Sequence, residues 1–125
     1  MFELCIKKAL IAQHALIGGD WGKENFPHSH AYVLEVLCRG KSLDRHNYLL
    51  DIVDLQKAID ALVDRYSDKM LNDLPEFKDT NPSLELFARV LHDRIKPDLQ
   101  RLGVSSFTIK LWENESCWAS YSAPE

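Results

Sequence analysis

The sequence predicts an α+β fold in which two strands, two helices and two further strands follow one another, the order ββααββ. Residues 2–16 and 28–39 alternate between apolar and polar side chains, which is the period of a β-strand. Residues 51–68 and 81–103 instead repeat apolar side chains at helical spacing, and strand-like segments return at 104–113 and 116–121. Runs of strands separated by a helix pair favour a four-stranded antiparallel sheet with two antiparallel helices on one face.

The first two predicted strands are joined by a glycine-containing loop. In residues 2–16, one side of the strand carries the apolar residues Phe2, Leu4, Ile6, Leu10 and Leu16, together with His14. The loop begins at Gly18, because glycine readily adopts the positive φ angles of tight turns. The second strand begins at His28, and one of its faces carries His28, His30, Tyr32, Leu34 and Val36.

The helices have recognisable ends. The first is predicted to begin at Asp51 or Asp54 and to end near residues 67–68, followed by a long connection over residues 69–80. Asn81 is predicted to cap the second helix, with Pro82 in its first position. A proline inside a helix kinks or ends it, so residue 97 is a predicted break, and glycine at 103 is a plausible stop.

The predicted arrangement leaves one face of the sheet uncovered. Two helices cover only one face of a four-stranded sheet, and the outer strands keep open edges. Closure of several sheets into one barrel solves both problems, so we expect residues 1–125 to form a single domain that assembles into a homo-oligomer.

Composition excludes some classes of function. The chain is 46% hydrophobic and 27% charged, which is typical of a globular protein, and its net charge of −4 argues against a nucleic-acid partner. Its three cysteines are far apart and odd in number, which indicates reduced thiols and a cytoplasmic location. We identify no signal peptide and no membrane-spanning segment.

The pattern His28-Ser29-His30 is the main candidate for chemistry. Alternate residues of a strand share a face, roughly 6–7 Å apart, so both imidazoles can reach one metal ion. A catalytic zinc site uses three protein ligands and keeps its fourth position open, and His14 is a candidate for the third. Two ordinary strand histidines are the alternative interpretation of this pattern.

Several segments in order resemble the 6-pyruvoyltetrahydropterin synthase / 6-carboxytetrahydropterin synthase family, whose lyases act on dihydroneopterin triphosphate. They are His14, the His-Ser-His of residues 28–30 where the family has His-Gly-His, and residues 50–55, 69–74, 81–89 and 111–113. The resemblance implies the T-fold, with trimers that close their sheets into barrels and pair into hexamers. It also implies active sites between subunits.

The resemblance further implies roles for individual residues. His14, His28 and His30 match the family's zinc ligands, and Glu113 matches the glutamate that anchors the pterin ring. A carboxylate suits that role because it accepts two hydrogen bonds side by side. A solvated carboxylate at a strand end is the alternative for Glu113. Glu85 matches a family glutamate, although a glutamate in the first turn of a helix is equally well explained by the helix dipole.

The chain departs from the family at two catalytic positions. Glu24 stands where the family has its cysteine, four residues before His28, and Ser67-Asp68 stands where it has an Asp-His pair. Glutamate at the first position is similar to a branch of the family that releases 6-hydroxymethyldihydropterin. Glu24 is therefore the candidate general base, provided that burial brings the pKa of its carboxyl near working pH. Asp68 either shares the role of the missing histidine or is a solvated charge at a helix end.

Three hypotheses about function follow. The first is a zinc-dependent lyase or aldolase-like enzyme acting on the side chain of a reduced pterin. The second is a hexamer that binds zinc and pterin but lacks the standard lyase activity. The third is an assembly module in which the histidines have only a structural role.

Overall fold

The computed structural model describes residues 1–124 and confirms the predicted order of strands and helices. The strands and helices are β1 (Phe2–His14), β2 (His28–Gly40), α1 (Ile52–Tyr66), α2 (Leu84–Arg101), β3 (Ser106–Asn114) and β4 (Cys117–Ser122). Three short 3₁₀ turns lie between them: η1 (Gly22–Asn25), η2 (Leu71–Asp73) and η3 (Pro75–Phe77).

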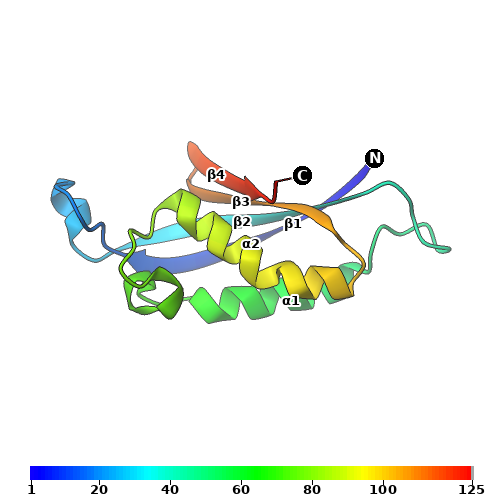
Figure 1. Ribbon diagram of the computed structural model, residues 1–125, viewed down its shortest axis with the longest axis horizontal. Helices are drawn as coiled ribbons and strands as arrows, with labels where there is room; N and C mark the ends of the chain where they lie inside the picture. Colours follow the sequence, from blue (N-terminus) through cyan, green and yellow to red (C-terminus); the bar gives the residue numbers. More distant parts are fainter. Residues whose placement is uncertain (125) are drawn as a thin grey trace.

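The four strands form one antiparallel sheet in the order β1-β2-β3-β4. Both helices lie on the same side of this sheet (Figure 1). The first strand ends at His14 rather than at residue 16, because the chain beyond it leaves β2 and bonds to other segments. The predicted sheet with both helices on one face is therefore confirmed.

The hydrophobic core lies between the sheet and the helices. The alternation read from the sequence is confirmed, since Leu34 and Val36 of β2 are fully buried on the helix-facing side. They are met by apolar residues of the helices, such as Leu55 of α1 and Phe87 of α2, which are also fully buried. Burial of one such side chain stabilises the fold by roughly 1.5–3 kcal/mol, so this core positions the strands that carry the site.

The helix starts agree only in part with the prediction. Asp51 caps α1, because its side chain accepts a hydrogen bond from the main-chain N–H of Val53. The prediction for α2 was wrong by two residues: Ser83, not Asn81, is the cap, and its hydroxyl accepts from the N–H of Leu86. Residues 81 and 82 precede the helix, and the carbonyl of Pro82 lies next to the ring of His14 instead.

Pro97 does not end α2, contrary to one of the predicted outcomes. The helix continues to Arg101 because the buried side chains of Ile95 and Leu99 hold it against the core on both sides of the proline. The prediction for Gly103 is confirmed: it has φ +82°, and its N–H donates to the carbonyl of Gln100 just after the helix ends.

The connection after α1 is an ordered part of the fold. Leu71 and Phe77 are buried in the core, so η2 and η3 are packed rather than loose. Beside them, the N–H of Asp68 donates to the carbonyl of Ile11 (2.7 Å), and the N–H of Gln13 donates to the carbonyl of Lys69 (2.9 Å). This segment therefore covers the edge of β1 next to His14.

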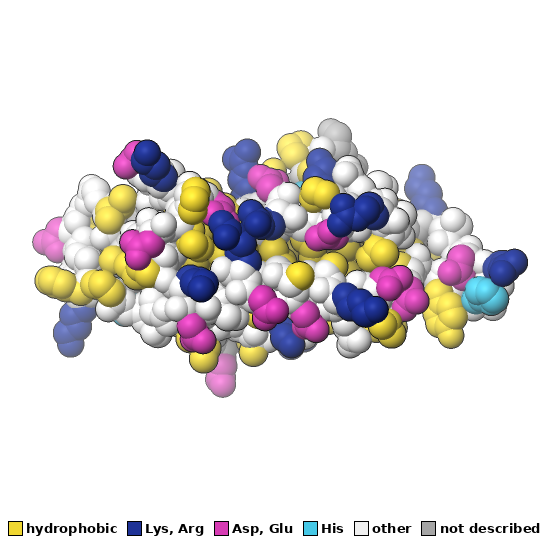
Figure 2. Space-filling model, turned by 90° about the horizontal axis from the view of Figure 1, so that it is seen from below, with side chains coloured by type: hydrophobic (Ala, Val, Ile, Leu, Met, Phe, Trp, Pro, Cys, Tyr) yellow, Lys and Arg dark blue, Asp and Glu magenta, His cyan; other side chains and the backbone are white. Residues whose placement is uncertain are grey.

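The two faces of the molecule differ in character. Figure 2 shows the helical face, on which positive and negative side chains are interspersed, as on an ordinary solvated surface. The opposite face of the sheet carries exposed apolar side chains beside charged ones such as Lys7, with Ile11 50% and Trp118 48% exposed.

Within residues 1–124, no helix is both long and apolar enough to cross a membrane.

Candidate metal centre

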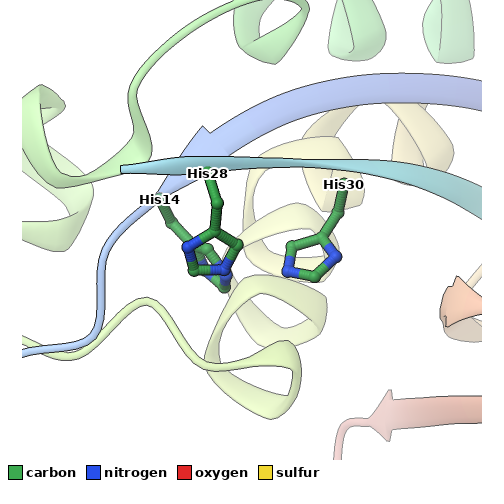
Figure 3. Close-up of side chains that lie close together, drawn as sticks. All are labelled: His14, His28 and His30. Atoms are coloured by element: carbon green, nitrogen blue, oxygen red, sulfur yellow. The ribbon is translucent and has the colours of Figure 1, made fainter. Parts of the chain in front are cut away.

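The register of the first two strands brings three histidines together. β1 and β2 pair so that His14 stands directly opposite His28, while His30 is paired with Ala12. The side chains of His14, His28 and His30 all lie on the helix-facing side of the sheet, at the end of β1 and the start of β2 (Figure 3).

The three imidazole rings converge on one point. Their centroids are 4.5 Å apart for His14 and His28 and 4.9 Å apart for the other two pairs. One ring nitrogen from each residue lies within 4.8 Å of the others. The rings meet edge to face rather than stacked, which directs nitrogen atoms toward a shared centre. The three residues therefore form a group that could hold one metal ion.

Two main-chain carbonyls orient the rings. His14 Nδ1 lies 2.8 Å from the carbonyl oxygen of Pro82, and His28 Nδ1 lies 2.8 Å from that of Phe26. A carbonyl only accepts, so each Nδ1 carries the proton and each Nε2 offers its lone pair. Burial lowers the pKa of His14 below its ordinary value, which favours the neutral, ligating form.

The residues present fit a metal ion. The Nε2 atoms of His28 and His30 are buried and have no hydrogen-bond partner within residues 1–124. Buried polar atoms normally have a partner, because an unpaired one costs about 1–3 kcal/mol. Neutral imidazoles with hydrogen-bonded Nδ1 atoms are typical zinc ligands, so a bound cation would satisfy both orphaned nitrogens.

Glu113 borders this cluster from β3. Its Oε1 atom lies 3.2 Å from His30 Nε2, although the alignment is not that of a hydrogen bond. The Glu113 side chain is 27% exposed, so it also reaches solvent at the mouth of the site. The carboxylate therefore lies beside the histidines and is at the same time partly open to solvent.

The other predicted site residues lie outside the cluster. Glu24 is an exposed residue of η1, in the connection between His14 and His28, and its carbonyl accepts from the N–H of Leu16 (2.8 Å). Asp68 is also exposed, with a positive φ of 59°, beside the edge of β1. Glu85 is an exposed residue in the first turn of α2. None of these three carboxylates joins the three-histidine group.

Some contributors to the site were not identified from the sequence. The carbonyls of Pro82 and Phe26 are main-chain groups, and any residue type supplies a carbonyl. Asn72, from η2, hydrogen-bonds to the main chain of Ala15, directly after His14. An asparagine in a connecting segment is usually interpreted as a turn residue. The residue type of Asn72 therefore does not predict its contact with Ala15.

Comparisons with known proteins identify relatives that share this fold. The family model described as 6-pyruvoyl tetrahydropterin synthase matches residues 3–124. The 6-pyruvoyl tetrahydropterin synthase of Caenorhabditis elegans is similar in structure, with a TM-score of 0.88 and 21% identity over 98% of this chain and 96% of that one.

Two further synthase structures share this architecture. The Plasmodium falciparum synthase matches with a TM-score of 0.81 and 12% identity over 98% of this chain and 97% of that one. A Plasmodium vivax synthase in which a catalytic glutamate is changed to alanine matches with a TM-score of 0.74 and 14% identity over 98% and 97% of the two chains. The fold is therefore the T-fold of these synthases.

Proposed function

The chain belongs to the 6-pyruvoyl tetrahydropterin synthase family, and we propose that it is a zinc-dependent lyase acting on the side chain of a reduced pterin such as dihydroneopterin triphosphate. The observation that carries this proposal is the convergence of His14, His28 and His30, in which two buried Nε2 atoms have no hydrogen-bond partner among the described residues 1–124. A purely structural histidine cluster would be expected to use those nitrogens in hydrogen bonds.

Zinc is the metal that this ligand set favours. Three neutral imidazoles hold zinc while leaving one coordination position open, which is the pattern of catalytic rather than structural zinc sites. When bound, the ion supplies a Lewis acid that acidifies hydroxyl groups of the substrate side chain. His14 and His28 remain oriented throughout by the carbonyls of Pro82 and Phe26.

Glu113 holds the pterin ring in this proposal. Its carboxylate accepts hydrogen bonds from the ring N–H and the 2-amino group of the pterin in a two-pronged geometry. Its contact with His30 supports this role, because a ring held by Glu113 would lie beside the three histidines. Glu85 is a further candidate for substrate contact from the start of α2.

Glu24 is the proposed general base. Its carboxylate would take the proton of the C2′ hydroxyl, and the C1′–C2′ bond would break as C2′ becomes an aldehyde. The electron pair left on C1′ would then take up a proton, so that the products are 6-hydroxymethyldihydropterin and a two-carbon aldehyde carrying the triphosphate. Glutamate has a precedent in this fold, because the matched Plasmodium vivax synthase has a catalytic glutamate. Glu24 lies in the connection between His14 and His28, which supports a role close to the three histidines. Asp68 is the proposed second proton carrier, beside the edge of β1.

Assembly into a homo-hexamer, a dimer of trimers, is part of the same proposal. The sheet face opposite the helices exposes large apolar side chains, among them Ile11 and Trp118, while the helical face is charged (Figure 2). Closing three sheets into a barrel buries that apolar face and pairs the open strand edges. Sites that form between subunits belong to the same proposal.

The test is a product assay with the zinc-loaded protein. Dihydroneopterin triphosphate is added and the products are identified by mass, with 6-hydroxymethyldihydropterin as the expected product. Glu24→Gln should lower the rate about a hundredfold or more. Glu3→Gln, which changes an exposed glutamate at the opposite end of β1, should leave it unchanged. An unaltered rate in Glu24→Gln would exclude Glu24 as the base.

A catalytically inactive binder is the second candidate function. The exposure of Glu24 and the substitution of the family's Asp-His pair by Ser67-Asp68 favour it. In that case the protein binds zinc and retains a reduced pterin through Glu113, but the assay yields no product. Zinc content and pterin binding, measured beside turnover, distinguish this candidate from the lyase.

A further inference from the structure

Both main-chain groups of Ala15, the residue directly after His14, bond to a single side chain from a distant segment. Ala15 follows His14, and its N–H donates to Asn72 Oδ1 at 2.9 Å. In return, Asn72 Nδ2 donates to the carbonyl oxygen of Ala15, also at 2.9 Å. One amide thus satisfies both main-chain groups of a buried residue that has left the β-ladder.

Asn72 is itself firmly placed. It lies in η2, next to Leu71, whose side chain is fully buried in the core. The segment leading to η2 also bonds to β1, because the N–H of Gln13 donates to the carbonyl of Lys69. Asn72 therefore connects the core to the point at which β1 ends.

This contact matters for His14 because the hydrogen bond to Pro82 constrains only the ring. The bond from Nδ1 to the carbonyl of Pro82 fixes the ring orientation, provided that the Cα of His14 does not move. On one side of His14, β1 is paired with β2, and on the other side only irregular chain follows. Asn72 constrains the chain on that second side.

We propose that Asn72 is a positioning residue for the metal-binding site: its two hydrogen bonds to Ala15 hold His14 so that its imidazole meets those of His28 and His30. The inference rests on the proposed function, in which these histidines bind zinc. An amide is required because only a group that donates and accepts at once satisfies both main-chain atoms of Ala15. Aspartate keeps the acceptor but loses the donor, and alanine loses both.

The first test is metal affinity. Zn²⁺ binding by Asn72→Ala should be about tenfold weaker than by the unmodified protein, as for other groups that orient metal ligands. Asn72→Asp should show a smaller loss, and it serves as the second variant if Asn72→Ala does not fold. The absorption spectrum of the Co²⁺-substituted protein reports the geometry of the ligands, so it should change more in Asn72→Ala than in Asn72→Asp.

Asp44→Ala is the matched control. The Asp44 side chain also accepts two main-chain hydrogen bonds, from His46 (2.8 Å) and Tyr48 (3.1 Å), but it lies after the end of β2 that is remote from the histidines. This variant should keep the unmodified Zn²⁺ affinity and Co²⁺ spectrum. A loss equal to that of Asn72→Ala would mean that general loosening of the fold explains both, and would overturn the inference.

A measurement without metal separates failure of the inference from failure of the proposed function. In the metal-free protein, ¹⁵N NMR should show His14 as a single tautomer with a slowly exchanging Nδ1 proton, and Asn72→Ala should lose that signature. If the unmodified protein binds no Zn²⁺, the proposed function fails while the NMR result still decides the role of Asn72. If Asn72→Ala keeps both the signature and the affinity, Asn72 does not position His14.

Discussion

Glu76 joins η3 to both helices, and its replacement by glutamine should destabilise the protein in a pH-dependent way. Its carboxylate accepts hydrogen bonds from Arg65 Nε (3.1 Å), Arg65 Nη2 (2.8 Å) and the Tyr66 hydroxyl (2.8 Å). The Arg94 guanidinium lies 3.8 Å away, and the Glu76 side chain is only 15% exposed. Glutamine preserves the size of the side chain but removes its charge.

The magnitude follows from the pKa of Glu76. Burial by itself raises this pKa, but the hydrogen bonds from Arg65 and Tyr66 outweigh burial, so the pKa is about 2 instead of the ordinary 4.5. One pH unit of difference corresponds to about 1.4 kcal/mol, so the charge contributes about 3 kcal/mol of folding free energy at neutral pH. We therefore expect Glu76→Gln to lose about 2–3 kcal/mol at pH 7.

The sign of the pH dependence is fixed by the lowered pKa. The contribution is fully present above the unfolded value of 4.5 and is lost as the pH falls toward 2, because the unfolded state then binds the proton first. Stability of the unmodified protein should fall more steeply over that window than stability of Glu76→Gln. The two proteins should converge near pH 2.

The assay is urea unfolding of metal-free protein at several pH values, so that zinc does not contribute. Lys8→Gln is a suitable control, since it removes one member of an exposed ion pair with Asp60 and should change the free energy of unfolding by less than about 1 kcal/mol. The reasoning would be refuted if the free energy of unfolding fell equally steeply with pH in Glu76→Gln and in the unmodified protein below pH 4.5. It would also be refuted if Glu76→Gln lost less than about 0.5 kcal/mol of this free energy at pH 7.

Three further predictions concern the site and the assembly. His28→Ala should reduce the zinc content of the purified protein, measured by atomic emission, to a small fraction of one ion per chain, because its Nε2 is one of the orphaned ligand atoms; stoichiometric zinc would contradict this. Glu113→Gln should weaken binding of a reduced pterin about tenfold or more in a fluorescence titration while zinc content stays unchanged, since it loses a charge-assisted pair of hydrogen bonds; equal affinity would exclude the anchoring role. Trp118→Glu should shift the mass measured by light scattering from a hexamer to smaller species, because it places a charge on the apolar sheet face; an unshifted hexamer would show that this face is not the interface.

Much of the fold was predictable because its signals are local. Alternation in β2 and helical spacing in α1 depend on neighbouring residues, and both identified the buried faces correctly. The errors lie at positions where tertiary packing prevails over local preference. Ser83 rather than Asn81 caps α2, and packing of Ile95 and Leu99 carries that helix past Pro97.

The grouping of His28 with His30 was predictable from their spacing, while His14 was added to them as a candidate and by the family resemblance. The spacing of His28 and His30 places both on one face of β2 whatever the rest of the chain does. The position of His14 depends on the register of β1 against β2, and the long connection over residues 15–27 does not fix that register as a two-residue turn would.

The period of each segment, the order of strands and helices, and the residue types that can hold a metal all follow from the amino-acid sequence alone. Only the tertiary structure decided that His14 stands opposite His28, that Pro82 orients its ring and that Asn72 holds the chain behind it. The physical reason is that periodicity arises from bonds between near neighbours, whereas these contacts join segments that are far apart in the chain. Such contacts exist only after the core has brought β1, η2 and α2 together.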